Sequence, residues 1–96
     1  MKKVFISQPM NGRSFEELMA ERNILTLIAQ SYFDEPIEVI DSYLKEEYAN
    51  PLYYIAESIK LLAQADAAIF APEWDNGRGC RVERKVCDEY GIRILM

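Results

Sequence analysis

The sequence contains no histidine, and this absence narrows the possible chemistry more than any other. Without an imidazole ring, a Ser-His-Asp or Cys-His triad, a zinc site with His ligands and a His general base are all excluded. The two cysteines, Cys80 and Cys87, are too few for a disulfide framework and indicate a reducing, cytoplasmic environment. Any catalysis must therefore use carboxylates, hydroxyls, thiols or backbone amides.

An excess of positive charge and long apolar runs are also missing. The chain of 96 residues has 11 Lys and Arg against 16 Asp and Glu, a formal net charge of −5. This balance is the opposite of a basic nucleic-acid surface, so we expect no nucleic-acid polymer as a partner. No apolar run approaches the roughly 20 residues that cross a bilayer, and the N-terminus turns polar too soon for a signal peptide. Length and composition predict one globular domain, residues 1–96, with no membrane partner.

Four short apolar runs between turn signals predict β-strands, because β-branched, aromatic or small apolar residues dominate each run. They cover residues 3–7, 37–41, 67–71 and 92–95. The third run has no polar residue, which is typical of a central parallel strand covered on both faces. Residues 42–49, which follow the second run, fit either a loop or a short helix.

The helices between these runs are marked by their end signals. Ser14 fits an N-cap that forms a capping box with Glu17. Asn50 and Pro51 fit the N-cap and the first position of a second helix. Gly91 fits the residue that ends a third helix.

This alternation of strands and helices predicts an α/β fold with a parallel sheet and right-handed crossovers. We expect a flavodoxin-like three-layer sandwich, with a four-stranded sheet in the order 2-1-3-4 and helices on both faces. In such a sheet the ligand lies beyond the carboxyl ends of the first and third strands. The loops to consider are therefore residues 7–13 and 72–79.

The apolar stripes of the first two helices predict which sides pack against the sheet. Arg22 interrupts the stripe of the first helix, and we expect its stem to lie along the surface with the guanidinium in water. The stripe that we expect to be buried in the second helix comprises Leu52, Ile55, Ile59, Leu62 and Ala63.

Glu83 is the residue that a purely structural interpretation explains least well. In the third helix, residues 79–90, it shares one face with Cys80, Cys87 and Tyr90, so its carboxylate points toward the core near the ligand edge. A buried carboxylate is costly unless it is paired or functional. It is either a structural acid that offsets the helix dipole and pairs with a neighbouring arginine, or an acid that takes part in chemistry.

Three segments of the chain resemble the nucleoside 2-deoxyribosyltransferase-like family. They are VFISQPMNGR around the first strand, LLAQADAAIFAPEW around the third strand, and NGRGCRVERKVCDEYGIRIL at the C-terminal end. The similarity covers nearly the whole chain and is greatest to a short, often phage-encoded branch of unknown function. Its most specific part runs from Trp74 through Arg78, Gly79 and Cys80 to Glu83.

The resemblance implies that the helix glutamate, here Glu83, attacks C1′ of a 2′-deoxynucleoside. The resemblance, together with the small size of the domain, implies a homo-oligomer (a dimer or larger) whose subunits share the site. The chemistry itself needs no metal and no cofactor. A carboxylate suits this chemistry because it stabilises an oxocarbenium-like state or traps it as a glycosyl ester. Two positions depart from the family's pattern: Phe5 stands where a tyrosine orients the glutamate, and Ser58 stands where an aspartate serves the leaving base.

The loop after the first strand supplies several candidate contacts. Ser7, Gln8, Met10 and Asn11 border the expected site and are candidate contacts to the base or the sugar. Arg13 is either a partner for a substrate phosphate or a solvated charge at the start of a helix.

The loop after the third strand supplies the others, each with a structural alternative. Asn76, Arg78 and Gly79 either cradle a phosphate at a helix start or form a turn with an exposed arginine. Trp74 either stacks on a base or seals a subunit contact. Asp41, at the end of the second strand, either binds a sugar hydroxyl or stays solvated.

The cysteines and tyrosines of the chain have simpler interpretations. Cys80 and Cys87 are favoured as small buried fillers over reactive thiols. The remaining aromatic group is more typical of core and interface than of a cofactor site, and it comprises Tyr43, Tyr48, Tyr53 and Tyr54.

Two functions remain open, and both have a small molecule as the partner. The first is N-glycosidic bond cleavage or base exchange on a 2′-deoxynucleoside or its 5′-monophosphate, with Glu83 as the nucleophile. The second is a non-catalytic module that binds or senses a nucleotide on the same fold. Phe5 and Ser58 favour the second function, whereas the inward carboxylate of Glu83 favours the first.

Overall fold

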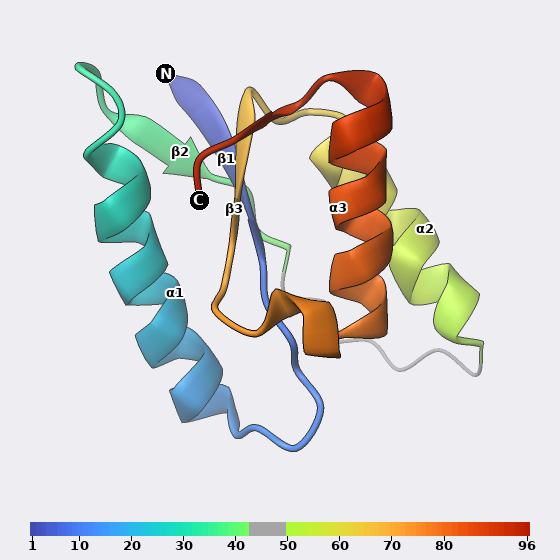
Figure 1. The fold of residues 1–96 in the computed structure, drawn as a ribbon. Helices are drawn as coiled ribbons and strands as arrows, with labels where there is room; N and C mark the ends of the chain where they lie inside the picture. The colour runs from blue at the N-terminus through green and yellow to red at the C-terminus, as the bar shows by residue number, and fades with distance from the viewer. Residues whose placement is uncertain (43–49) are drawn as a thin grey trace.

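The computed structural model describes residues 1–42 and 50–96 (Figure 1). The strands are β1 Lys2–Ser7, β2 Ile37–Val39, β3 Ala67–Phe70 and β4 Arg93–Ile94. The helices are α1 Phe15–Gln30, α2 Pro51–Leu62 and α3 Arg78–Tyr90, with a short 3-10 helix at Trp74–Asn76. None of these described helices combines the length and the apolar character that a membrane span requires.

All four strands are parallel and follow the order β2-β1-β3-β4, which confirms the predicted α/β fold and its strand order. The central strand β1 places Val4 opposite both Val39 and Ala67, and Ser7 opposite Phe70. The strand order reverses between β1 and β3. Their carboxyl ends therefore form the edge at which open α/β sheets bind ligands.

The predicted helix ends are also confirmed, except that the Glu17 carboxylate accepts from the Ser14 hydroxyl at 3.3 Å and not, within the described chain, from the Ser14 backbone N–H that a full capping box requires. The Ser14 hydroxyl oxygen accepts a hydrogen bond from the N–H of Glu17 at 3.1 Å, and Asn50 Oδ1 accepts one from the N–H of Leu52 at 2.9 Å. Gly91 ends α3 with a φ of 72°, a left-handed conformation that glycine adopts without the Cβ penalty. Local side-chain chemistry thus sets where these helices begin or end.

The helices cover both faces of the sheet, α1 on one side and α2 with α3 on the other (Figure 1). Side chains alternate along β1, so Val4 and Ile6 pack with Leu25 on the α1 face, while Phe5 and Ser7 point to the opposite face. The core on that opposite face is formed by Phe5, Ile40, Leu62, Ala68, Phe70 and Cys87. The sheet therefore separates two cores, and the ligand edge lies at one end of both.

Arg22 differs from its prediction. Its side chain is only 9% exposed, and its guanidinium donates hydrogen bonds to Gln8 Oε1 at 3.2 Å, to Ser42 Oγ at 3.3 Å and to the carbonyl oxygen of Ile40 at 3.4 Å. The expectation of a guanidinium in water is wrong. Acceptors that follow β1 and β2 take the place of water around the charge.

The stripe predicted for α2 is buried only in part. Leu62 is fully enclosed, but Leu52 is 68% exposed, because the N-terminal half of α2 borders a cavity and not the core. In the predicted tyrosine group, Tyr53 is exposed and Tyr54 is half-buried, while Tyr43 and Tyr48 lie outside the described residues.

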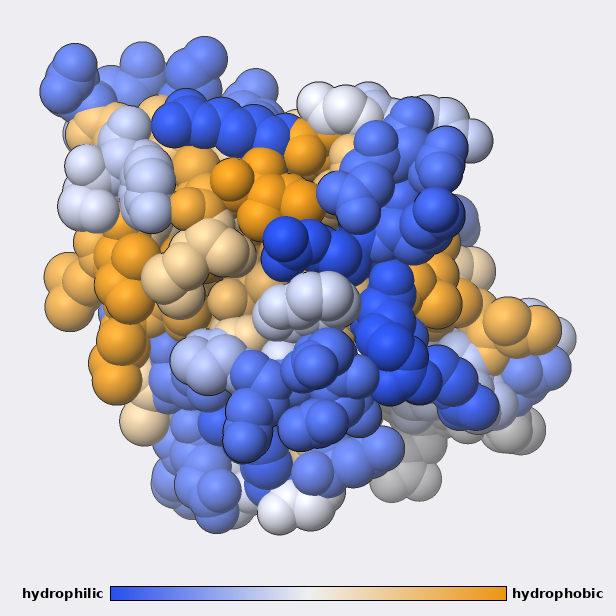
Figure 2. Space-filling view, in the orientation of Figure 1, coloured by the Kyte–Doolittle hydropathy of each residue, from blue (hydrophilic) through white to orange (hydrophobic). Residues whose placement is uncertain are grey.

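The surface is divided in a way that matches the ligand edge. On the face drawn in Figure 2, apolar surface gathers over α1 and the C-terminal residues, whereas the loops that follow β1 and β3 are polar. Ile24 and Leu27 are among the exposed apolar side chains of α1. The polar end of the molecule is therefore the end to which the strand order directs a ligand.

Candidate active site

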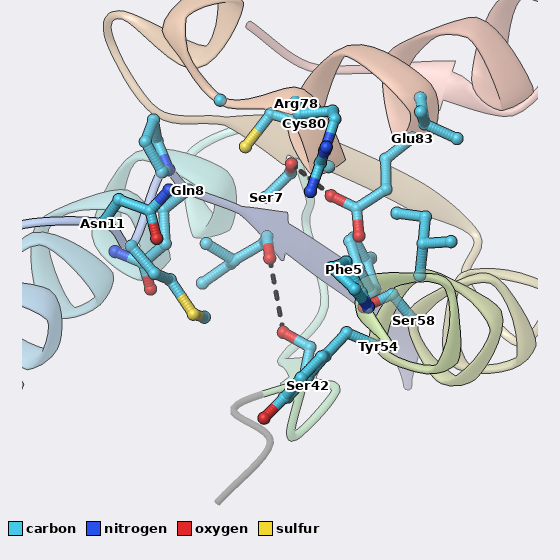
Figure 3. A pocket seen from close by; sticks show the side chains of 18 of the residues that line it. Phe5, Ser7, Gln8, Asn11, Ser42, Tyr54, Ser58, Arg78, Cys80 and Glu83 are labelled. Atoms are coloured by element: carbon cyan, nitrogen blue, oxygen red, sulfur yellow. Dashed lines mark hydrogen bonds between the residues drawn. The ribbon is translucent and has the colours of Figure 1, made fainter. Parts of the chain in front are cut away.

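A cavity of about 680 Å³ lies at the carboxyl end of β1, on the face covered by α2 and α3 (Figure 3). Its walls come from β1 and the loop after it, Ser42 beyond β2, the N-terminal half of α2 and the start of α3. This volume is within the range of small-molecule sites. The predicted site residues that line it are Ser7, Gln8, Met10, Asn11, Ser58, Arg78, Gly79 and Glu83.

Glu83 is the one carboxylate in the described wall of this cavity. As helical periodicity predicts, it points inward: the residue is 7% exposed, and its Oε1 accepts a hydrogen bond from the Ser7 hydroxyl at 2.6 Å. Among residues 1–42 and 50–96, no Lys or Arg forms an ion pair with it. The arginine partner of the structural interpretation is thus missing from the described chain.

Burial raises the pKa of the Glu83 carboxyl above its ordinary value of 4.5. Hydrogen bonds from Ser7 and Ser58 favour the charged form and oppose this shift, but burial is the larger effect. A glutamate with a raised pKa keeps its proton to a higher pH than an ordinary one, and its ionised form can act as a nucleophile. The site is therefore suited to acid–base or nucleophilic chemistry.

The two positions that depart from the pattern of the resembled family both line this cavity. Phe5 lines the cavity from β1 with a buried ring and brings no polar group. Ser58 lines it from α2 and interacts with Glu83 through its hydroxyl. Neither residue is a carboxylic acid that could protonate a leaving group, so the described wall supplies no second carboxyl for that step.

Gln8 anchors the loop that follows β1 onto α1. Its Nε2 donates to Glu21 Oε1 at 3.0 Å, and its Oε1 accepts from Arg22. Arg13 donates to the same Glu21 oxygen at 2.8 Å and to the carbonyl oxygen of Pro9 at 3.0 Å. The network fixes the loop that forms one wall of the cavity.

Three of the predicted site residues lie elsewhere at this edge. Arg13 pairs with Glu21, and together with Asn76 they border a second, smaller cavity of about 440 Å³ on the other side of the loop after β1. Asp41 is exposed and lines neither cavity. The predicted joint phosphate site is therefore divided: Arg78 and Gly79 reach the larger cavity, whereas Arg13 and Asn76 do not.

Trp74 also lies away from the larger cavity. Its ring meets that of Phe70 edge-on at a centroid distance of 5.9 Å, and the Arg84 guanidinium lies 4.7 Å from the Trp74 ring centroid. The indole is already used in packing beside β3. This arrangement is the reason that Trp74 does not take the predicted place as a stacking platform in the cavity.

The start of α3 closely approaches the loop after β1. A Cβ at Gly77 would lie 3.2 Å from Cys80 Sγ and 3.4 Å from Pro9 Cβ, so glycine permits this approach. Arg78 points into the cavity (Figure 3) and Gly79 lines it. A guanidinium and the N–H groups of a helix start therefore face the cavity, and their binding of a phosphate stays a prediction.

The structure also brings residues to the cavity that sequence reasoning did not select as site residues. Among them are Ser42, Asn50, Tyr54, Ile55 and Cys80. Ser42 directly follows the second predicted strand, and that position at the ligand edge was the signal that could have identified it. Burial raises the pKa of the Cys80 thiol, the reverse of what activates a thiolate, and raises that of Cys87 to about 11.

The described part of the chain, which excludes residues 43–49, holds no group of three or more His, Cys, Asp or Glu side chains that could bind a metal ion. Comparison of the chain with protein-family models, curated proteins and solved structures gave no match in any of the three. The similarity to the nucleoside 2-deoxyribosyltransferase-like family therefore stays a prediction based on the sequence segments quoted above.

Proposed function

We propose that this chain cleaves or exchanges the N-glycosidic bond of a 2′-deoxynucleoside or of its 5′-monophosphate, with Glu83 as the nucleophile. One observation carries the proposal: the Glu83 carboxylate is buried, bonded to Ser7 and without an ion pair among the described residues, at the wall of a cavity of about 680 Å³. A buried carboxylate without a counter-charge destabilises the fold, which supports a role in chemistry. The family resemblance supplies the substrate class.

The reaction needs two displacements at C1′ of the sugar. The ionised Glu83 carboxylate attacks C1′, the C1′–N bond breaks, and its electron pair leaves with the base, which takes a proton from the solvent. Attack by water then releases the deoxyribose and returns a proton to the solvent, whereas attack by a second base gives the exchanged nucleoside. Either step restores the carboxylate, and the carboxylate also stabilises the oxocarbenium-like transition state.

The remaining walls of the cavity are suited to hold the rest of such a substrate. Met10 and Asn11 from the loop after β1 offer apolar and amide contacts to a base. Arg78 and the N–H groups beside Gly79 offer a guanidinium and a helix start to a 5′-phosphate. In this part of the proposal the phosphate lies at the α3 side of the cavity.

A non-catalytic nucleotide-binding module is the second candidate. The observation that favours it is the absence of a second carboxyl group from the described cavity wall, because glycoside cleavage usually has an acid that assists the leaving group. A binding module would use the same cavity and would release no base.

The decisive experiment measures base release. The chain is incubated with each 2′-deoxynucleoside and each deoxynucleoside monophosphate, with ribonucleosides as a comparison, and free base is detected by chromatography. We expect release from at least one deoxy substrate, and a decrease of about a thousandfold or more in Glu83→Gln. The control is Glu89→Gln, which changes an exposed acid of the same helix that pairs with Lys85, and it should retain activity.

The alternative outcomes separate the two candidates. Nucleotide binding in calorimetry without release of any base would support the binding module and reject the nucleophile. An unchanged rate in Glu83→Gln would remove Glu83 from its role. Neither binding nor release would reject both candidates.

The proposal includes a homodimer or larger homo-oligomer in a reducing, cytoplasmic setting. Apolar side chains stand exposed at the cavity rim, where a second subunit would cover them: Met10, Leu52 and Val82. Cys80 and Cys87 are both buried free thiols, as a reducing setting allows. Sedimentation should give at least a dimer at micromolar concentration, and a monomer would contradict this part of the proposal.

A further inference from the structure

Ser7 provides a rigid hydrogen-bond donor at the base of the cavity. It is the last residue of β1, it is 2% exposed, and its carbonyl oxygen accepts a hydrogen bond from the N–H of Ala71 at 2.9 Å. β1 is the strand between β2 and β3, so pairing on both sides fixes its position. The hydroxyl of Ser7 therefore has a defined place relative to the sheet.

The carboxylate of Glu83 meets two hydroxyls from two different elements. Ser7 Oγ donates to Oε1 at 2.6 Å from β1, a short distance typical of a charge-assisted bond. Ser58 interacts with the same group from α2, and Figure 3 shows the carboxylate between Ser7 and Ser58. The side chain thus bridges α3 to the sheet and to α2, although Ser7 and Glu83 are 76 positions apart in sequence.

The other groups around this carboxylate add little charge. Cys80 and Cys87 flank it on α3, and burial raises the pKa of both thiols, so they stay neutral near pH 7. Tyr54 on α2 and Ser42 after β2 line the same cavity. Arg78 points into the cavity but makes no ion pair with Glu83. Within the described chain, the two serine hydroxyls are the groups that fix the acid.

We propose that Ser7 is the positioning residue for Glu83: its hydroxyl holds Oε1 against the end of β1 and thereby orients the carboxylate toward the reacting carbon. The catalytic part of this inference rests on the proposed function, whereas the positioning itself does not. Phe5, two residues earlier on the same face of β1, has no hydroxyl, so within this strand the donor is at position 7. The same hydroxyl also interacts with the Cys80 thiol, so removal of the Ser7 hydroxyl should disturb the acid and this neutral thiol and leave the other walls of the cavity in place.

The first test measures the pKa of the Glu83 carboxyl by carbon-13 NMR in the wild type and in Ser7→Ala. We expect an upward shift of about one pKa unit, because the lost hydrogen bond favours the charged form. Ser42→Ala is the matched control, since Ser42 is a buried serine of the same cavity that donates to the carbonyl oxygen of Ile6. Its Glu83 pKa should equal that of the wild type.

The second test measures base release as a function of pH. In Ser7→Ala the acidic limb of the profile should move up by about the same one unit, and kcat should fall by about tenfold to a hundredfold with little change in KM. Ser7→Cys, which keeps the shape and a weaker donor, should give intermediate values in both tests. It also serves as the test variant should Ser7→Ala fail to fold.

The outcomes distinguish this inference from the proposed function. A Glu83 pKa that is the same in wild type, Ser7→Ala and Ser7→Cys would overturn the positioning role, whatever the activity. A Glu83 pKa that shifts in Ser7→Ala, while the wild type itself releases no base, would support the positioning role and reject the proposed function. Equal shifts in Ser7→Ala and Ser42→Ala would also overturn it, because the effect would then be a general one.

Discussion

Arg22 and Glu83 are both ionisable, both buried and on opposite helical layers, but their polar groups are accommodated differently. The Arg22 guanidinium meets three acceptors of the protein and lines neither cavity. Glu83 receives hydroxyl hydrogen bonds and faces a cavity. Burial lowers the pKa of Arg22 and raises that of Glu83, so each charged form is disfavoured by its surroundings.

The comparison separates two uses of a buried charge. Arg22 joins residues after β1 and β2, and its hydrogen bonds are satisfied within the fold. Glu83 leaves its carboxylate next to space for a small molecule, where a substrate could complete its surroundings. The first arrangement stabilises a structure, whereas the second is typical of a site. Variants of Arg22 and Glu83 test this distinction directly, and variants of Leu25 and Glu73 measure the packing and the backbone strain of the fold around it.

The largest effect is expected from removing packed apolar atoms on the α1 face. Leu25→Ala, at a side chain that is fully enclosed, should lower the free energy of unfolding by about 3 kcal/mol. Ile55→Ala, at a half-buried side chain of the cavity wall, should cost only about 1 kcal/mol, because it enlarges existing space. Urea unfolding of both variants measures the difference. Equal losses would mean that the two faces are packed alike.

A smaller loss is expected from Arg22→Met, which keeps the length of the stem and removes the charge. The oxygen atoms of Gln8 and Ile40 then lose a donor inside the protein, and we expect a loss of about 2 kcal/mol. Arg84→Met is the control, since that guanidinium lies over the rings of Phe70 and Trp74, and it should cost about 0.5 kcal/mol. A neutral Arg22→Met would show that the charge does not stabilise the fold.

The pH dependence of stability should show how much ionisation of Glu83 lowers the free energy of unfolding. Because its folded-state pKa is raised above 4.5, the folded chain keeps a proton that the unfolded chain releases. The retained proton contributes to the free energy of unfolding. This stabilisation is fully present below about pH 4.5 and is lost as pH rises through the folded-state pKa, at roughly 1.4 kcal/mol per unit of pKa difference.

The measurement compares urea unfolding of the wild type and of Glu83→Gln from about pH 4 to pH 8. The wild type should lose stability relative to the variant as pH rises above about 4.5, because only the wild type acquires the buried charge. A wild type that gains stability relative to Glu83→Gln with rising pH would contradict the direction of the shift.

The smallest effect is expected at Glu73, outside both cores. It has a φ of 64°, a left-handed conformation that is strained in residues with a Cβ. Glu73→Gly should raise the free energy of unfolding by about 0.5 to 1 kcal/mol, because the relief of strain exceeds the entropic cost of glycine. Glu73→Ala keeps the Cβ and should give no gain. Equal gains in both variants would assign the effect to the charge.

Much of the fold could be predicted because its signals are local. Ser14, Asn50 and Gly91 act through hydrogen bonds or dihedral angles within a few residues, and each acts as expected. The uninterrupted apolar run at β3 indicated a central strand, and Ala67–Phe70 is buried throughout. Hydrophobic periodicity and helix-capping residues can be recognised without knowledge of the rest of the chain.

The candidate site could be predicted only in outline. The helical periodicity was enough to predict that Glu83 points inward, and the expected strand order was enough to select the loops around Gln8 and Arg78. The contact partners of these side chains could not be predicted, because each side chain has several possible partners that are distant in sequence and become neighbours only in the folded chain. Arg13 meets Glu21, and Trp74 meets Phe70, and neither contact has a signature in the sequence.

The sequence by itself determined an α/β chain without imidazole chemistry and an acid on the inner face of its last helix. Residue types and their short-range spacing are sufficient for both, since caps, periods and side-chain chemistry are local properties. Only the tertiary structure decided that Ser7 reaches Glu83 and that Arg22 is enclosed. Those contacts join residues from separate elements, and their distances exist only after the sheet and helices have packed.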